Sequence, residues 1–117
     1  MKEKMRKFLK ILSVELEDIK EDLKFMEEQQ ERRKNSNEIT DYVYLENIGM
    51  IKKEFTGIAV AEEVLSSVSA DDFQDMDELV EALIKSLATR LASADLPPSI
   101  LEICKRKIAK VMRFVLD

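Results

Sequence analysis

The stretch that decides the fold runs from Met5 to Met26 and reads MRKFLKILSVELEDIKEDLKFM. Its apolar residues recur at alternating intervals of four and three positions: Met5, Leu9, Leu12, Leu16, Ile19, Leu23 and Met26. This spacing places them along one face of an α-helix, as in helices that pack side by side. The pattern predicts a single long helix over about residues 3–33.

A second helix follows a turn. Asn35, Ser36 and Asn37 favour turns and helix N-caps, so the helix is predicted to begin at about residue 38. Its main apolar face has the same spacing: Tyr44, Ile48, Ile51, Phe55 and Ile58. Val43 and Met50 widen this face, so we expect two neighbouring helices. The pattern changes phase after Gly57, which predicts a bend or break there.

Two shorter helices complete the chain. Ser69 or Asp71 can cap a third helix, whose predicted buried residues are Phe73, Met76, Val80, Leu83, Leu87 and Leu91. Pro98 and Ser99 suit the first turn of a fourth helix. Its predicted buried residues are Leu101, Cys104, Ile108, Val111 and Val115.

The composition agrees with an all-α protein, since 45% of residues are hydrophobic, 37% are charged, and there are only two Gly and two Pro. We expect an antiparallel four-helix bundle built from two helical hairpins, the first one longer, in a single domain over residues 1–117. In the second hairpin, folding back would place Lys110 and Arg113 near Glu78 and Glu81.

Several classes of chemistry lack their usual residues. The chain has no His, which removes the commonest general base and the imidazole ligands of metal sites. The one cysteine, Cys104, falls among buried positions, so we expect an inert thiol and no internal disulfide. We also expect no cofactor. No apolar run reaches the ~20 residues of a membrane span, and no secretion signal is evident, so a cytoplasmic protein without membrane association is expected.

Three carboxylates near the end of the first helix form an EExxE pattern, at Glu27, Glu28 and Glu31. The pattern resembles the first half of the motif of all-α nucleoside triphosphate pyrophosphatases. That resemblance implies Mg²⁺ held by carboxylates of two helices and hydrolysis of a nucleotide. The second half, ExxD on the next helix, is not matched, because Glu46 and Glu54 are each followed three positions later by Gly. The alternative interpretation is a solvated helix end.

The last helix carries a basic stripe formed by Arg106, Lys110 and Arg113. Such a stripe can bind the phosphates of a nucleic acid. The alternative interpretation is structural, because basic side chains near a helix C-terminus interact favourably with the helix dipole. With a net charge of −5, we do not expect nucleic acid to be the main partner.

Some apolar residues lie outside the predicted buried faces. On the first helix they are Phe8, Ile11, Val14 and Phe25, and near the end of the chain Ile103, Phe114 and Leu116. Of these, Ile11, Val14, Phe25, Phe114 and Leu116 are the expected contact residues. Surplus apolar faces on long helices indicate a partner. We therefore expect a non-enzymatic helical interaction or adaptor protein that works as a homodimer through these residues, and that can also bind another protein.

Overall fold

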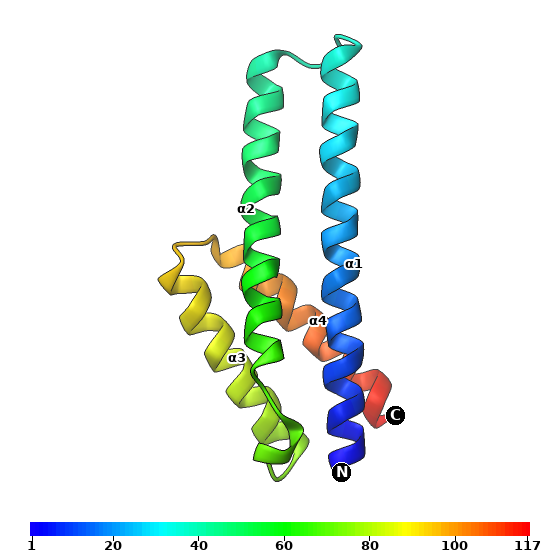
Figure 1. Cartoon of the computed structure of the whole chain (residues 1–117), viewed down its shortest axis with the longest axis vertical. Coiled ribbons are helices and arrows are strands. Elements are labelled where there is room, and N and C mark those ends of the chain that lie inside the picture. The colour runs from blue at the N-terminus through cyan, green and yellow to red at the C-terminus, as the bar shows by residue number, and fades with distance from the viewer.

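The computed structural model describes residues 1–117 and is all-helical, as predicted, with four α-helices and no strands. The helices are α1 (Lys2–Asn35), α2 (Asp41–Ser66), α3 (Met76–Ser93) and α4 (Pro98–Leu116), with a short 3-10 helix, η1, at Ala70–Asp72. Figure 1 shows α1 and α2 side by side along the long axis, while α3 and α4 lie obliquely across their lower part. The molecule measures 55 × 29 × 18 Å.

The α1–α2 turn is longer than predicted. The Ser36 hydroxyl donates to the carbonyl oxygen of Arg32 at 3.0 Å, and Asn37 adopts a left-handed conformation with φ of 62°. Thr40, and none of the three predicted residues, caps α2, because its hydroxyl oxygen accepts from the backbone N–H of Val43. The second helix therefore begins at Asp41, a few residues later than predicted.

Of the bend or break predicted near Gly57, the break is absent. Helix α2 runs without interruption from Asp41 to Ser66, and Gly57 is buried inside it. A Cβ atom at Gly57 would lie 2.3 Å from Cδ1 and 2.8 Å from Cγ2 of Ile100 in α4. The glycine therefore serves close packing of α2 against α4, and the shift of the apolar pattern reflects a change of neighbour along one continuous helix.

The third helix also begins later than predicted. Ser69 caps η1, and Asp75 caps α3 through its carboxylate, which accepts from the backbone N–H of Glu78 at 2.8 Å. The buried residues of α3 are Met76, Leu79, Leu83, Leu87 and Leu91. Those of α4 are Ile100, Cys104, Ile108, Val111 and Val115. The predicted and observed buried faces of α3 and α4 therefore differ mainly in the first turn of each helix.

All four helices contribute to one core. Helix α1 contacts α2 and α4, and α3 contacts the same two helices. At the centre, side chains from all four surround an apolar void of about 10 Å³, lined by Leu12, Leu16, Ala61, Leu65, Leu83, Leu87, Cys104 and Ile108. No buried polar side-chain atom lacks a hydrogen-bond partner. Burial of these apolar side chains is the main stabilising term.

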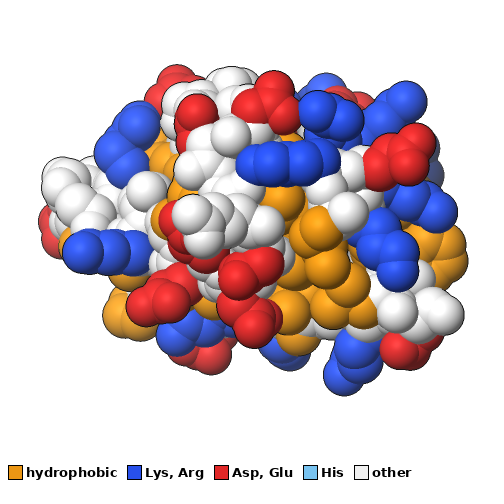
Figure 2. Space-filling view, turned by 90° about the horizontal axis from the view of Figure 1, so that it is seen from below, with side chains coloured by type: hydrophobic (Ala, Val, Ile, Leu, Met, Phe, Trp, Pro, Cys, Tyr) orange, Lys and Arg blue, Asp and Glu red, His pale blue; other side chains and the backbone are white.

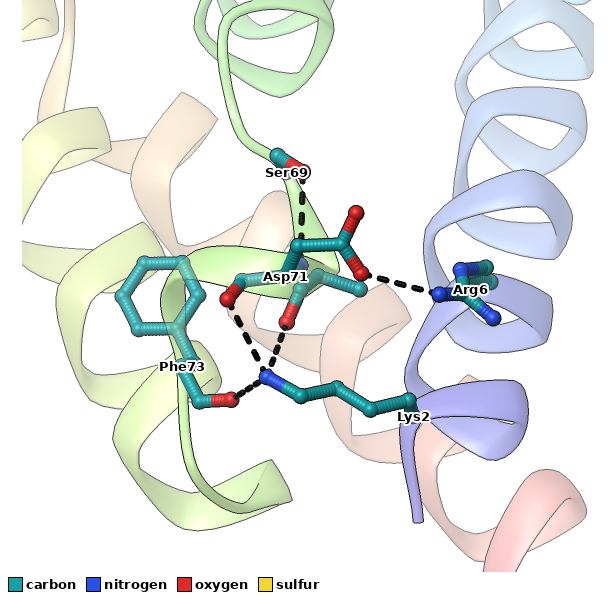
Figure 3. A network of polar contacts seen from close by, with 6 residues as sticks. Lys2, Arg6, Ser69, Asp71 and Phe73 are labelled. Atoms are coloured by element: carbon teal, nitrogen blue, oxygen red, sulfur yellow. Dashed lines mark hydrogen bonds and ion pairs between the residues drawn. The ribbon is translucent and has the colours of Figure 1, made fainter.

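A polar network fastens the start of α1 to the segment between α2 and α3 (Figure 3). The Lys2 ammonium donates to the carbonyl oxygens of Ala70 at 3.1 Å, of Asp71 at 3.2 Å, and of Phe73. The Arg6 guanidinium lies 2.9 Å from the Asp71 carboxylate. These contacts join residues almost seventy positions apart in sequence, so they hold η1 against the first turns of α1.

The far part of the α1–α2 pair projects beyond α3 and α4 (Figure 1). We call residues 24–50 the arm. Ile48 is the only buried residue within it, and Ile48 lies outside the main core cluster. Asn47 donates to the side-chain oxygen of Gln30 at 2.8 Å, which joins the two helices of the arm. The arm is thus a two-helix segment with little buried apolar surface.

None of the four helices is apolar over a length sufficient to cross a bilayer.

Candidate interaction surfaces

One apolar surface lies where α1 and α4 meet. An open hollow of about 210 Å³ there is lined by Ile11, Glu15, Lys110, Val111 and Phe114. The Phe114 side chain is 65% exposed, and the Lys7 ammonium lies 5.6 Å from the centre of its ring. Figure 2 views the end of the molecule that carries both termini and shows apolar atoms in a strip between charged side chains of both signs.

The five predicted interface residues occupy two separate areas. Ile11 and Phe114 come together at the α1–α4 hollow, although Ile11 is half-buried and packs against the core. Val14 and Leu116 are exposed on the same two helices. Phe25 is also exposed but lies on the arm, about 16 Å further along α1 than Val14 at ~1.5 Å of rise per residue.

The sequence interpretation missed most of the apolar surface on the arm. The exposed side chains there, besides Phe25, are Met26, Tyr42, Val43, Leu45 and Met50. The widened apolar pattern of α2 was the available signal, and we assigned it to a second neighbouring helix. In the structure α3 packs against the lower part of α2 and does not extend along the arm (Figure 1). The apolar side chains of the arm therefore lie open to solvent.

A second hollow follows the basic stripe of α4. It measures about 550 Å³ and is lined by Ile103, Arg106, Lys107, Ala109, Lys110 and Arg113. Two of its cations are engaged by α1, because Lys110 Nζ lies 2.7 Å and Lys107 Nζ 3.9 Å from the carboxylate oxygens of Glu15. The hydrogen bond from Lys110 lowers the pKa of Glu15 below its usual value, against the opposing effect of burial.

The predicted partners of the basic stripe are wrong. Lys110 bonds Glu15 of α1 and not Glu78 or Glu81 of α3, and Arg113 makes no ion pair. Lys107 and Lys110 therefore lie on the side of α4 that faces Glu15 of α1. Arg106 and Arg113 are exposed and unpaired, so they are the cations of the stripe that remain available to an anionic ligand.

The acidic cluster does not assemble into a metal site. Glu28 and Glu31 are exposed on the arm, while Glu27 is half-buried and lines a hollow with Lys24, Lys52, Phe55 and Thr56. No three carboxylate, thiol or imidazole side chains converge as a metal site. The neighbours of Glu27 in its hollow include two cations, which suit an isolated carboxylate better than a ligand set for Mg²⁺.

Cys104 is buried, as predicted, among the apolar residues of the core. Burial raises the pKa of its thiol to about 11. The thiol is therefore protonated at neutral pH and is a poor nucleophile.

No protein-family model matches this chain, and neither a curated protein nor a solved structure matches it.

Proposed function

We propose that this chain is a non-enzymatic helical interaction protein that works as a homodimer through apolar helix faces. A homodimer is the simplest arrangement in which one chain type covers its own apolar surface, since two-fold dimers are the commonest oligomers. Such a dimer can also present its remaining faces to another protein, which would give it an adaptor role.

The observation that carries the proposal is the distribution of exposed apolar side chains. Ten large apolar side chains are exposed, and six of them lie on the arm: Phe25, Met26, Tyr42, Val43, Leu45 and Met50. Single exposed apolar residues are ordinary on monomeric proteins, but a group of them on one projecting segment marks an interaction site.

The proposal takes the four helices as two antiparallel hairpins, α1 with α2 and α3 with α4, packed as a bundle. The contacts between successive helices are consistent with this pairing. Because the first hairpin is longer, its far end has no counterpart in the second. The excess length thus provides a surface for association without altering the core.

Light scattering coupled to size exclusion tests the homodimer. The chain mass is 13.5 kDa, and we expect twice this value at micromolar concentrations, falling towards the chain mass on dilution. Two variants show which surface forms the dimer: Phe25→Ser removes an aromatic side chain from the arm, and Phe114→Ser removes one from the α1–α4 surface. Thr89→Ser, at an exposed position on α3, is the control. A particle of 13.5 kDa at every concentration would contradict the homodimer.

A second candidate function, nucleic-acid binding, is favoured by the hollow whose lining includes Arg106, Lys107, Lys110 and Arg113. Retention on immobilised DNA or RNA should then fall steeply with salt. Retention should be lost in the double variant Arg106→Glu with Lys110→Glu. The double variant Lys4→Glu with Lys85→Glu, at exposed positions of α1 and α3, should still be retained. Retention of the α4 variant would exclude this function.

A further inference from the structure

The two glycines of the chain differ in what surrounds them. Gly57 is buried against Ile100, which explains the absence of a side chain there. Gly49 lies in the interior of the same helix and is exposed. Apart from its chain neighbours and the adjoining backbone of its own helix, no atom lies within 4 Å of where its Cβ would be. Glycine in a helix interior is less stable than alanine by about 1 kcal/mol. Packing within the chain does not account for Gly49.

Gly49 lies at the centre of an exposed face of α2. Tyr42 and Thr56 are each seven residues away from it, so they align with it along the helix, and Leu45 is one turn before it. Tyr42 is 73% and Leu45 67% exposed. The small residue at the centre of this face would allow another helix to approach closely.

The two halves of this face carry charges of opposite sign, negative before Gly49 and positive after it. Glu46 precedes Gly49 and Lys53 follows it, and neither side chain makes an ion pair within the chain. The two residues are seven positions apart and lie on the same side of the helix. A face with this pattern is complementary to a copy of itself in the opposite direction.

We propose that a second copy of this chain packs antiparallel on α2, with a two-fold axis beside Gly49. In this register the two Gly49 backbones face each other, and the Glu46 carboxylate of each copy lies within about one residue's rise, ~1.5 Å along the axis, of the Lys53 ammonium of the other, an offset that the two side chains can span. The proposal rests on the homodimer proposed above and identifies the surface that forms it, the exposed face of α2 around Gly49 and not the α1–α4 hollow.

In the same register, the Tyr42 side chain of each copy lies beside a hollow on the other copy. Tyr42 of one copy lies opposite Thr56 of the other. Beside Thr56 is an open hollow of about 330 Å³, lined by Lys52, Lys53, Thr56, Ala94, Asp95 and Leu96. The Tyr42 ring can occupy this hollow, where the Asp95 carboxylate can accept a hydrogen bond from the phenol. Aromatic residues seated in pockets of this kind commonly dominate the energy of an interface.

Charge reversal on the full chain tests the register. Glu46→Lys and Lys53→Glu each create two like-charge contacts in a homodimer, so each should weaken self-association by roughly tenfold or more. The double variant Glu46→Lys with Lys53→Glu should restore the homodimer. A mixture of the two single variants should form a heterodimer, because each contact then joins opposite charges. Sedimentation velocity measures all four, and circular dichroism checks that each variant is folded.

The outcomes separate this surface from homodimerisation itself. Loss in both single variants with recovery in the double variant and in the mixture supports the proposal. A wild-type dimer whose single variants associate equally well overturns the α2 surface and leaves the homodimer in place. Weakening without recovery in the double variant or the mixture overturns the antiparallel register. A wild-type monomer overturns both proposals.

Discussion

The two ends of the α1–α2 pair contain the same types of apolar residue, but these residues are buried at one end and exposed at the other. Phe8, near the start of α1, is fully buried, although the apolar spacing places it outside the predicted buried face, whereas Phe25 on the same helix is 59% exposed. Near Phe8 the helix α4 and the segment η1 close around α1, and along the arm only α2 accompanies it. Apolar spacing therefore specifies a helix face, while the reach of the neighbouring helices decides whether that face becomes core or surface.

The largest effect expected from this comparison is that of removing an aromatic ring at each end. Phe8→Ala should destabilise the protein by about 3–5 kcal/mol, because it leaves a cavity in the core. Phe25→Ala should change the free energy of unfolding by less than about 0.5 kcal/mol, measured in dilute solution. Urea denaturation followed by circular dichroism gives both values. Equal losses would mean that the arm has a packed core of its own.

The two glycines should respond with opposite signs. Gly57→Ala forces Ile100 to move, which costs about 1–3 kcal/mol and outweighs the gain in helix propensity of up to about 1 kcal/mol. Gly49→Ala meets no atom beyond its chain neighbours and the adjoining backbone of its own helix, and should stabilise the dilute monomer by about 0.5–1 kcal/mol. Thermal unfolding compares them directly. A destabilised Gly49→Ala monomer would contradict the open environment of this position.

The two ends can also be compared through their lysines. Lys2→Met removes three hydrogen bonds from a charged donor to the η1 segment and should cost about 1–2 kcal/mol. Lys34→Met removes only the contact with the Tyr44 ring, whose centre lies 4.6 Å from Nζ, and should cost about 0.5 kcal/mol. Chemical denaturation at one pH and salt concentration measures both. A larger loss at Lys34 would contradict this ranking.

The smallest effect is a pH dependence from the packed end. Because the pKa of Glu15 is lowered in the folded state, its contribution is present above the unfolded pKa of about 4.3 and is lost as pH falls through the folded pKa. The contribution should stay below about 1 kcal/mol, since Lys110 is exposed. Below pH 5, wild type should lose more stability than Glu15→Gln. Glu31→Gln, on the arm and without an ion pair, should follow the wild-type curve.

The helices were predictable from the sequence because their signals are local. The apolar spacing from Met5 to Met26, the proline at Pro98 and the alternation of apolar and charged residues each act within a few turns. The structure has four helices near the predicted positions. The N-cap residues were predicted less accurately, because several neighbours of Thr40 and Asp75 suit the N-cap position equally well.

The arrangement of the helices in space was less predictable. The pairing of Lys110 with Glu15 and the need for Gly57 beside Ile100 depend on how α4 crosses α1 and α2, which no local pattern encodes. The exposed face of Tyr42 and Leu45 was missed for the same reason, because a widened apolar face is equally compatible with a second neighbour in the chain and with a partner outside it.

Hydrogen exchange of the full chain at two concentrations tests most directly whether a second copy covers the α2 face around Gly49. At low concentration we predict fast exchange of arm amides relative to those of the core, as expected for a segment with little buried surface. At high concentration the amides of residues 41–56 should become protected, while those of α3 should not change. Identical exchange of residues 41–56 at both concentrations, with the protein dimeric at the higher one, would contradict the packing of a second copy on α2.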